Sequence, residues 1–398
     1  MISYREAYRI VLEHIMYCDI ESVRLSESNG CILAEDIYAD RDFPPFDRVT
    51  KDGIAIQYKT YENGIREFNV QEIAAAGESQ KELKDPSSCI EVMTGAILPK
   101  NTDTVIMYEH LNIKNGTAKV EIVPEKGQDI HAQGSDKEKG ALLLHKNQKI
   151  NAAEVGVLAS VGKATVRVKK LPKIGVISTG DELVAVEKTP AAHQIRKSNS
   201  FTLESVLKVE MIDSKKLHFN DLEKELTTGV EHALNEFDVL LLSGGVSKGK
   251  FDFLPKVMED LGVTKLFHRV KQRPGKPFWF GNHREKKCTI FAFPGNPAST
   301  FANYHIYFLP WLSKSLGKSI PNHRVVLNEA FENKTDLTRF VRAQVKLEDG
   351  MIKATLVNAN GSGDLTSLST SNGFIRIEPS TNYEVGEVLP FYPTKRIV

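Results

Sequence analysis

The residues best suited to chemistry follow a short apolar run in the second half of the chain. The run 239–242 is apolar throughout and predicts a strand buried on both faces. Asp252 stands at the start of the next helical pattern, where a carboxylate can hold a metal ion or cap the helix. The connecting residues let the backbone turn sharply and present N–H groups to an anion, and they include Ser243, Gly244, Gly245 and Ser247. This segment predicts a ligand site at the end of a strand, and the alternative is a tight connection that binds nothing.

Two further loops follow apolar strands. The first, 178–183, contains Asp181 and Glu182, and the second consists of Pro294, Gly295, Asn296 and Pro297. If the strands are parallel neighbours, all three loops open at one edge of the sheet. Acids in a first helical turn also offset the helix dipole, by about 0.3–1 kcal/mol, which is the alternative role for Asp181 and Glu182. Beside Asp252 on the same edge, we expect an oxygen-rich Mg²⁺ site in which Glu182 and Asp252 are ligands.

A basic segment at 271–277 precedes another short apolar strand. Arg273 and Lys276 are suited to binding phosphate, and the proline and glycine between them fix the backbone. The alternative is a solvated turn.

Acidic and hydroxyl side chains also occur in turns of the N-terminal half. Asp52 precedes a glycine, Thr94 follows a predicted strand, and Asp136 lies among turn residues. Asp-Gly is a common turn pair, so Asp52 alone does not indicate a catalytic acid. No Ser, Cys or His arrangement has the spacing of a nucleophilic triad, and the 11 histidines are dispersed.

The elements that must position these residues change in type along the chain. Residues 1–42 begin with a helix and, with 140–170, form an N-terminal linker and helical region. Residues 43–139 show short alternating segments typical of a small β-rich domain. From 171 to 320 strands and helices alternate, which predicts a doubly wound, mainly parallel α/β domain. Residues 321–398 return to alternating strands and form a small β domain.

The α/β prediction depends on particular apolar patterns. Strands are predicted at 174–177, 239–242 and 289–293, and helices at 199–209, 221–237, 253–261 and 298–312. In the terminal domains the clearest strands are 67–73, 118–123, 340–345 and 374–377.

Composition excludes several classes of protein. The 398 residues suggest roughly two to four domains. A net charge of +1 gives no global attraction to nucleic acid or to an anionic membrane. No apolar run reaches the length of a membrane span, and Ser3 to Glu6 is a capping-box pattern instead of a signal peptide. The four cysteines are scattered, which argues against zinc and disulfides and favours a reducing cytoplasmic location.

Taken in order, these segments resemble the molybdopterin molybdenumtransferase (MoeA) family, which includes the homologous domain of gephyrin. The resemblance spans nearly the whole chain. The segments that carry it are 45–53, 93–96, 178–183, Ile195-Arg196 with Ser198-Asn199, 243–252, 273–277 with 294–297, and in the last domain 361–365 with Asn372-Gly373.

The resemblance implies a fold and an activity. It implies a MogA-like, pterin-binding α/β domain, a discontinuous N-terminal region and a C-terminal β barrel. It further implies a homodimer whose active site is shared between subunits, a transferase that inserts molybdenum from molybdate into adenylated molybdopterin, and Mg²⁺-dependent release of AMP. Molybdopterin adenylyltransferase and molybdoenzyme apoproteins are the partners that such an enzyme would have.

The resemblance also assigns roles to residues. Glu182 and Asp252 would position the metal or water, Asp52 and Asp136 would act across the dimer, and Thr94 would contact an oxyanion. Phosphate or molybdate binds Arg273 and Lys276. The pterin and its phosphate are cradled by Ser198, Gly244, Gly245, Ser247, Pro294, Gly295, Asn296 and Pro297.

The chain departs from the family pattern at three places. The family usually has Ser-Ala-Met-Asp-Gly-Tyr-Ala where 49–55 reads Val-Thr-Lys-Asp-Gly-Ile-Ala. Lys197 replaces an Asn or Asp, and Ser135 replaces a Glu. Two alternatives follow: a molybdopterin adenylyltransferase, which usually lacks the terminal β domains, and a pterin-binding scaffold protein that has lost turnover.

Overall fold

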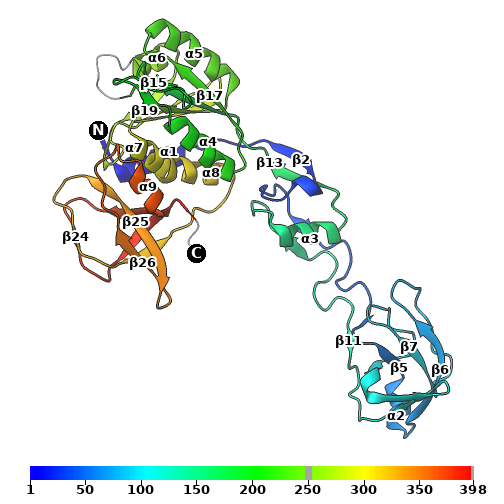
Figure 1. Ribbon diagram of the computed structural model, residues 1–398. Coiled ribbons are helices and arrows are strands. Elements are labelled where there is room, and N and C mark those ends of the chain that lie inside the picture. Colours follow the sequence, from blue (N-terminus) through cyan, green and yellow to red (C-terminus); the bar gives the residue numbers. More distant parts are fainter. Residues whose placement is uncertain (247–252, 396–398) are drawn as a thin grey trace. The chain divides into compact units, whose positions relative to one another are not determined.

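The computed structural model describes residues 1–246 and 253–395, which divide into two compact units (Figure 1). Ser247 and Asp252 lie outside the described residues. The first unit comprises Met1–Glu21, Gly30–Ile32 and Arg167–Val398, and the second comprises Ser22–Asn29 and Leu33–Val166. Within the described ranges, no helix combines the length and apolar character that crossing a bilayer requires.

A six-stranded sheet forms the centre of the α/β part of the first unit. Its order is β17-β14-β18-β22-β21-β19. The four parallel strands are β14 (Ile174–Thr179), β17 (Ser214–Phe219), β18 (Val239–Ser243) and β22 (Cys288–Phe293). The antiparallel edge consists of β21 (Trp279–His283) and β19 (Thr264–His268). This arrangement confirms the mainly parallel α/β domain.

Helices cover both faces of this sheet (Figure 1). Ile174 and Val176 pack into a core with α1, α4, α7 and α8, whereas Ile177 packs with α5 and α6 on the opposite face. Side chains along a strand alternate between faces, so β18, which is apolar at 239–242, serves both cores. The helices are α1 (Tyr4–Glu13), α4 (Asn199–Val209), α5 (Glu223–Glu236), α6 (Leu254–Asp260), α7 (Pro297–Asn303) and α8 (Leu309–Ser315).

The predicted helix 298–312 is not a regular α-helix throughout. A π-helical turn, η3 (Tyr304–Phe308), joins α7 to α8. Such wide turns occur often at functional sites. The fully buried Tyr304, Ile306, Tyr307 and Phe308 belong to this turn.

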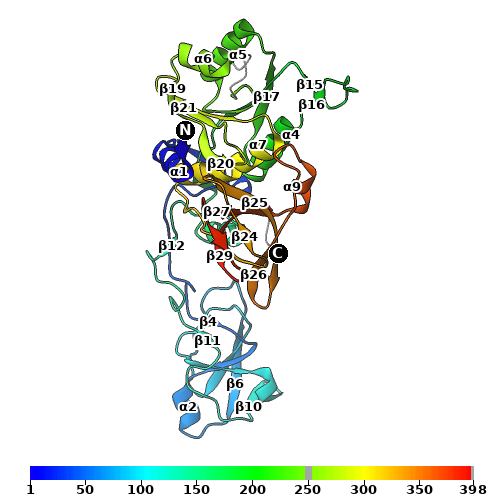
Figure 2. The ribbon, with the colours of Figure 1, turned by 90° about the vertical axis from the view of Figure 1, so that its left-hand side faces the viewer.

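The C-terminal part of the first unit is a closed sheet (Figure 2). Strands pair in the order β25-β26-β23-β29-β27, and β27 pairs again with β25, which confirms the β barrel. Its strands are β23 (Arg324–Leu327), β25 (Thr338–Glu348), β26 (Met351–Leu356), β27 (Gly373–Ile377) and β29 (Val388–Pro393). Two short strands, β20 (Val270–Arg273) and β1 (Ile2–Ser3), extend the sheet beyond β25. Smaller elements here are β24 (Phe331–Glu332), β28 (Asn382–Tyr383) and α9 (Thr366–Thr370).

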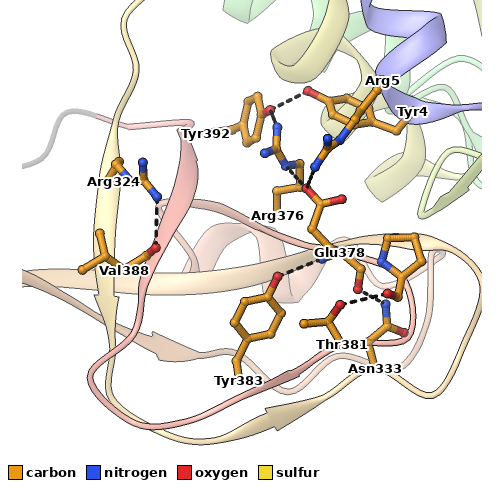
Figure 3. A network of polar contacts seen from close by, with 11 residues as sticks. Tyr4, Arg5, Arg324, Asn333, Arg376, Glu378, Thr381, Tyr383, Val388 and Tyr392 are labelled. Carbon is orange, nitrogen blue, oxygen red and sulfur yellow. Dashed lines mark hydrogen bonds and ion pairs between the residues drawn. The ribbon is translucent and has the colours of Figure 1, made fainter.

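The N-terminal helix α1 belongs to this unit and joins the α/β core to the barrel. Ser3 caps it by accepting a hydrogen bond from the Glu6 N–H at 3.2 Å, so a helix begins where the capping pattern predicted one. The Tyr4 hydroxyl lies 2.6 Å from that of Tyr392 on β29 (Figure 3). Arg5 pairs with Glu378 across the same contact at 3.3 Å.

The second unit is built on a mixed sheet with the order β8-β5-β7-β6-β10-β9. Apolar residues cover both of its faces, with Ala55 and Val92 in one core and Ile54 and Ile106 in the other. Its strands are β5 (Gly53–Ile56), β6 (Glu67–Ala74), β7 (Ser88–Val92), β8 (Thr104–Met107), β9 (Leu111–Lys114) and β10 (Thr117–Val120).

Short elements complete the second unit. They are η1 (Leu25–Glu27), β3 (Ile37–Tyr38), β4 (Arg48–Val49), α2 (Tyr58–Glu62), η2 (Tyr108–His110), β11 (Ile130–His131), β12 (Leu142–Leu144) and α3 (Ala152–Ser160). Strands β2 (Ile20–Arg24) and β13 (Thr165–Lys169) include the residues at which the chain passes from one unit to the other.

Candidate functional site

A pocket of about 460 Å³ opens at the carboxyl ends of β14, β18 and β22. All three predicted loops contribute to it, because these parallel strands are direct neighbours in the sheet. The lining residues that the sequence singled out are Glu182, Ser198, Gly244, Gly245, Pro294, Gly295, Asn296 and Pro297.

Two glycines bring the loop after β18 against the end of β14. Gly244 and Gly245 have φ angles of +103° and +69°, a region that other residues rarely adopt. A Cβ on Gly244 would lie 2.9 Å from the Thr179 carbonyl oxygen, and one on Gly245 would lie 2.6 Å from Leu254 Cδ1. Both positions therefore require glycine. The buried Thr179 hydroxyl lies beside this loop and has no hydrogen-bond partner in the described structure.

Asn199 holds two of the loops together. Its Nδ2 donates to Ser243 Oγ and to the Gly295 carbonyl, both at 2.7 Å. Thr300 Oγ1 donates to the Pro294 carbonyl at 2.6 Å. Side-chain hydrogen bonds thus fix the pocket wall before any ligand arrives.

The acids of this pocket come from the loop after β14 and from the residues just before α5. Glu182 and Asp221 line the pocket, while Asp181 Oδ1 accepts a hydrogen bond from the Asp221 N–H at 3.1 Å. Asp181 therefore positions the backbone beside the pocket instead of facing the ligand space.

A two-stranded pair brings cations to the pocket beside Glu182, whose carbonyl accepts a hydrogen bond from the Ile195 N–H at 2.9 Å. Strand β15 (Leu183–Val184) pairs with β16 (Ile195–Arg196), and Arg196 and Lys197 line the cavity. Burial, and then the nearby Lys188, lowers the pKa of Lys197.

The two predicted phosphate-binding cations do not line this pocket. Arg273 lines a neighbouring cavity of about 390 Å³, together with Arg339 and Arg342 of β25. Lys276 lines neither cavity, although Pro277 next to it lines the first. Ser362 links the two cavities, since its hydroxyl accepts a hydrogen bond from Asn296 Nδ2 at 2.8 Å.

The neighbouring cavity is strongly cationic. The Nε atoms of Arg339 and Arg342 are buried and have no hydrogen-bond partner among the described residues. Burial lowers the pKa of both guanidinium groups, and Arg273 adds to the effect on Arg339. Such a cluster is suited to a small oxyanion.

Sequence reasoning missed Arg339 and Arg342, although β25 carries a signal. Thr338, Phe340 and Arg342 share one face of the strand, and all three are buried. A basic residue at a buried position of an alternating strand is costly unless a partner compensates it. That position marks a candidate anion contact.

In the second unit, Asp52 and Thr94 are direct partners. The Thr94 N–H donates to Asp52 Oδ1 at 2.6 Å. This bond, followed by that from the Thr94 hydroxyl, lowers the pKa of the exposed Asp52 carboxyl. The carboxylate is therefore held ionised and in one orientation.

Asp136 belongs to a second polar group, which the sequence did not predict. Its Oδ1 lies 3.0 Å from His131 Nε2, and Arg48 Nη2 lies 3.1 Å from His131 Nδ1. The pairing of β4 with β11 places Arg48 opposite His131. No single motif contains these residues, so the sequence held no local signal for the group.

Backbone hydrogen bonds of Val49 connect the segment that carries Arg48 to the turn that carries Thr94. Its carbonyl accepts from the Gly95 N–H at 2.9 Å, and its own N–H donates to the Ala96 carbonyl at 3.0 Å. The turn that holds Thr94 is thereby fixed beside the strand that holds Arg48. Residues 48–52, 94–96 and 131–136 form one polar surface.

No cluster of three or more His, Cys, Asp or Glu residues able to hold a metal ion occurs within residues 1–246 and 253–395. Asp252, one of the two predicted ligands, lies outside those ranges.

Comparisons with known proteins identify the relatives of this architecture. Residues 2–162 match the model of the MoeA N-terminal region (domain I and II), and residues 175–314 match that of a probable molybdopterin binding domain. Residues 324–394 match the model of the MoeA C-terminal region (domain IV). A molybdopterin molybdenumtransferase from Synechocystis is 38% identical over 98% of this chain and 100% of its own length. The chain belongs to the molybdopterin molybdenumtransferase (MoeA) family.

Other members of the MoeA family agree with this placement. A molybdopterin molybdenumtransferase from Bacillus subtilis is 32% identical over 98% of this chain and 94% of its own length. A gephyrin from Dictyostelium discoideum is 32% identical over 82% of this chain and 51% of its own length. The crystal structure of a molybdopterin biosynthesis MoeA protein from Pyrococcus horikoshii covers 100% of both chains, with a TM-score of 0.84 and 29% identity.

Proposed function

We propose that this protein is a transferase of molybdenum cofactor biosynthesis, which inserts molybdenum from molybdate into adenylated molybdopterin and releases AMP. The observation that carries the proposal is the match to molybdopterin molybdenumtransferases along the whole chain, 38% identical to the Synechocystis protein. The pocket at the sheet edge supports it with a suitable shape and polarity.

The pocket at the sheet edge is proposed to bind the adenylated pterin. Its volume of about 460 Å³ falls within the range of small-molecule sites. Gly244 and Gly245 would bring the backbone close to an anionic group. Arg196 and Lys197, which also line the pocket, would neutralise phosphate charge.

The cationic cavity is proposed to receive molybdate. Arg273, Arg339 and Arg342 provide the positive charge that a small dianion needs, and partial burial of Arg339 and Arg342 would strengthen their pairing with it. The hydrogen bond between Asn296 and Ser362 joins this cavity to the pterin pocket. Molybdate would thus be stored beside the group that accepts the metal.

Glu182 of the first pocket and Asp252, which lies outside the described residues, are proposed to hold Mg²⁺. Glu182 and Asp252 would be ligands, and the oxygen-only donor set, which Asp221 extends, fits a hard cation. Such an ion neutralises charge that develops when the phosphoanhydride is cleaved. Glu182 and Asp221 would meanwhile orient the attacking water.

The polar surface of the second unit is proposed to complete the pocket of another subunit. Asp52, fixed by Thr94, would accept a proton, while His131 would hold Asp136 in place. A homodimer with shared sites explains how residues of two separate units serve one reaction. We further propose a cytoplasmic enzyme that receives its substrate from molybdopterin adenylyltransferase and delivers its product to molybdoenzyme apoproteins.

The full-length match favours this function over adenylyltransferase activity alone. The matched regions include both the N-terminal and the C-terminal regions of the family, which a stand-alone adenylyltransferase does not need. An assay of turnover distinguishes the enzyme from a pterin-binding scaffold protein that has lost turnover.

Turnover is the test. The wild-type protein is incubated with adenylated molybdopterin, molybdate and Mg²⁺, and AMP release and active cofactor are measured. We expect AMP release that requires molybdate. Equal rates for the wild type and the double variant Asp52→Asn, Glu182→Gln would contradict the enzyme proposal and support the scaffold. Consumption of ATP with bare molybdopterin would instead indicate adenylyltransferase activity.

A further inference from the structure

The turn 274–277, which follows β20, contributes to both cavities of the first unit. Pro274 lines the cationic cavity, and Pro277 lines the pterin pocket. Arg273, the last residue of β20, lines the cationic cavity directly before the turn. The place of its guanidinium group therefore depends on how the turn is held.

Three buried polar side chains contact this turn from the protein interior. Gln272 Nε2 donates to the Pro274 carbonyl at 3.0 Å, and Asn303 Nδ2 donates to the Gly275 carbonyl at 3.3 Å. The two amides are joined by a hydrogen bond of 2.9 Å from Gln272 Nε2 to Asn303 Oδ1. The Tyr307 hydroxyl donates to Gln272 Oε1. All three side chains are 0% exposed.

The hydrogen-bonding capacity of this buried network is well used. Both N–H donors of the Gln272 amide and its carbonyl oxygen have partners. The turn packs directly on the network, because a Cβ on Gly275 would lie 2.3 Å from Asn303 Oδ1. Buried amides are costly unless they are paired, and a network that is paired throughout favours one arrangement of its groups. The carbonyls of the turn are thereby held in one place.

The charges of the cationic cavity oppose this placement of Arg273. The register of β20 with β25 sets Arg273 beside Arg339, and like charges on neighbouring strands repel. Glu329 also lines the cavity, and its Oε1 accepts a hydrogen bond from the Leu356 N–H at 2.7 Å. A turn that is held from the interior offsets the repulsion and keeps Arg273 at the cavity.

We propose that Gln272, Asn303 and Tyr307 are positioning residues, which hold the turn after β20 so that Arg273 meets the anion of the cationic cavity. The inference deepens the proposed function and rests on it, because the anion is the molybdate assigned to this cavity. Since the three side chains are fully buried, they act through Arg273 and do not touch the anion.

Binding of molybdate to the full-length protein, measured by calorimetry without nucleotide or turnover, tests the proposal. Tyr307→Phe removes one hydroxyl and leaves Gln272 Oε1 unpaired, so molybdate should bind about fivefold more weakly. Arg273→Gln removes the charge itself and should weaken binding about tenfold. Thermal unfolding of each variant shows that it is folded.

The double variant shows whether the network acts through Arg273. If it does, Tyr307→Phe should cause no further loss of molybdate affinity in protein that already carries Arg273→Gln. Losses that multiply in the double variant would contradict the proposal.

The matched control is Tyr304→Phe. Tyr304 is a buried tyrosine of the same helical turn η3, but its hydroxyl donates to the Val206 carbonyl, at 3.2 Å, instead of to the network. This variant should lower the temperature of unfolding about as much as Tyr307→Phe and leave molybdate affinity unchanged. An equal loss of affinity in both variants would mean general damage to the core and would overturn the proposal.

Hydrogen exchange gives a readout that needs no ligand. The Val270 N–H closes the turn by donating to the Lys276 carbonyl at 2.9 Å, and its exchange should be about fivefold faster in Tyr307→Phe than in the wild type or in Tyr304→Phe. Unchanged exchange would overturn the proposal.

Failure of this inference differs from failure of the proposed function. A wild-type protein that binds no molybdate would refute the molybdate site, and hydrogen exchange would still decide whether the network holds the turn. Wild-type binding that Tyr307→Phe leaves unchanged would refute the network alone, and would mean that the pairing of β20 with β25 suffices to place Arg273.

Discussion

The pocket at the sheet edge and the polar surface around Asp52 are built in different ways. Backbone conformation shapes the pocket: Gly244 and Gly245 adopt positive φ angles that bring one loop against another. Side chains shape the polar surface, where an exposed carboxylate is oriented by the hydrogen bond from Thr94. The first region is suited to holding an anionic ligand, and the second to holding an oriented negative charge.

Damage to the two regions should therefore have different consequences. A side chain added to the glycine loop disturbs packing and binding together, because the same atoms serve both. A change to an exposed acid removes chemistry and leaves the fold intact. Variants of each region can therefore tell effects on folding and binding from effects on chemistry.

The largest effect is expected for Gly245→Val. The added side chain clashes with Leu254 and forces valine into a left-handed conformation, which should lower the free energy of unfolding by about 2–4 kcal/mol and abolish binding of adenylated molybdopterin. Chemical denaturation and calorimetry measure both effects. The stability control is Gly295→Ala, whose Cβ meets only Gly244 Cα at 3.7 Å and should leave unfolding within about 0.5 kcal/mol. Equal stability of the two variants would contradict the backbone account.

Asp52→Asn should lower kcat for AMP release by roughly 10²–10⁴-fold and leave the affinity for adenylated molybdopterin unchanged. Steady-state kinetics and direct binding separate these effects. Asp85→Asn is the matched control, because Asp85 is also an exposed aspartate of this unit whose pKa is lowered by local hydrogen bonds, here from Ser87. A similar loss of kcat in both variants would mean that general damage to the unit, and not Asp52, is responsible.

Arg342→Gln should raise the KM for molybdate roughly tenfold and leave the affinity for adenylated molybdopterin unchanged, because the lost charge faces the cationic cavity only. Rates measured across molybdate concentrations test this. The exposed Arg284→Gln should have no effect. An unchanged KM in the Arg342 variant would remove molybdate from this cavity.

The smallest effect is expected for Thr94→Val, which removes the hydroxyl hydrogen bond to Asp52 and keeps the backbone one. The pKa of Asp52 should then rise toward the ordinary value, because the weaker of two stabilising contacts is lost. Carbon NMR of the labelled carboxyl groups measures the shift. An unchanged or lowered pKa would contradict the role given to the hydroxyl.

The lowered pKa of Asp52 also makes the stability of the folded protein depend on pH. Since the pKa of Asp52 is lower in the folded than in the unfolded chain, its hydrogen bonds stabilise the folded protein above the unfolded pKa. That stability is lost as the pH falls through the folded pKa. Because Thr94→Val raises the folded pKa of Asp52, this loss of stability should begin at a higher pH in the variant.

Much of the α/β domain could be predicted from the sequence, because its signals are local. The run 239–242 is apolar on both faces and bounded by glycine, and it forms β18. Helix α4 has the predicted bounds, 199–209. The predicted helix 298–312 was interrupted by a π turn, since nothing in the periodicity of that segment marks where a wide turn replaces an α turn.

The parts of the candidate site that depend on contacts between distant segments could not be predicted from the sequence. The loops at the ends of neighbouring parallel strands met as predicted, because topology alone brings them together. Arg273 lined a different cavity because β20 joins the barrel sheet through β25, a pairing that no local pattern reveals. The contact of His131 with Asp136 likewise depends on strand pairing between distant segments.

Complementation between two inactive variants tests the central claim most directly. Asp52→Asn and Glu182→Gln proteins are each assayed alone, then unfolded together, refolded to exchange subunits, and assayed again for AMP release. If one subunit supplies Asp52 to the pocket of the other, mixed dimers contain one intact site, and about a quarter of the wild-type activity should return. If activity stays at the level of the separate variants although mixed dimers have formed, the shared site is contradicted.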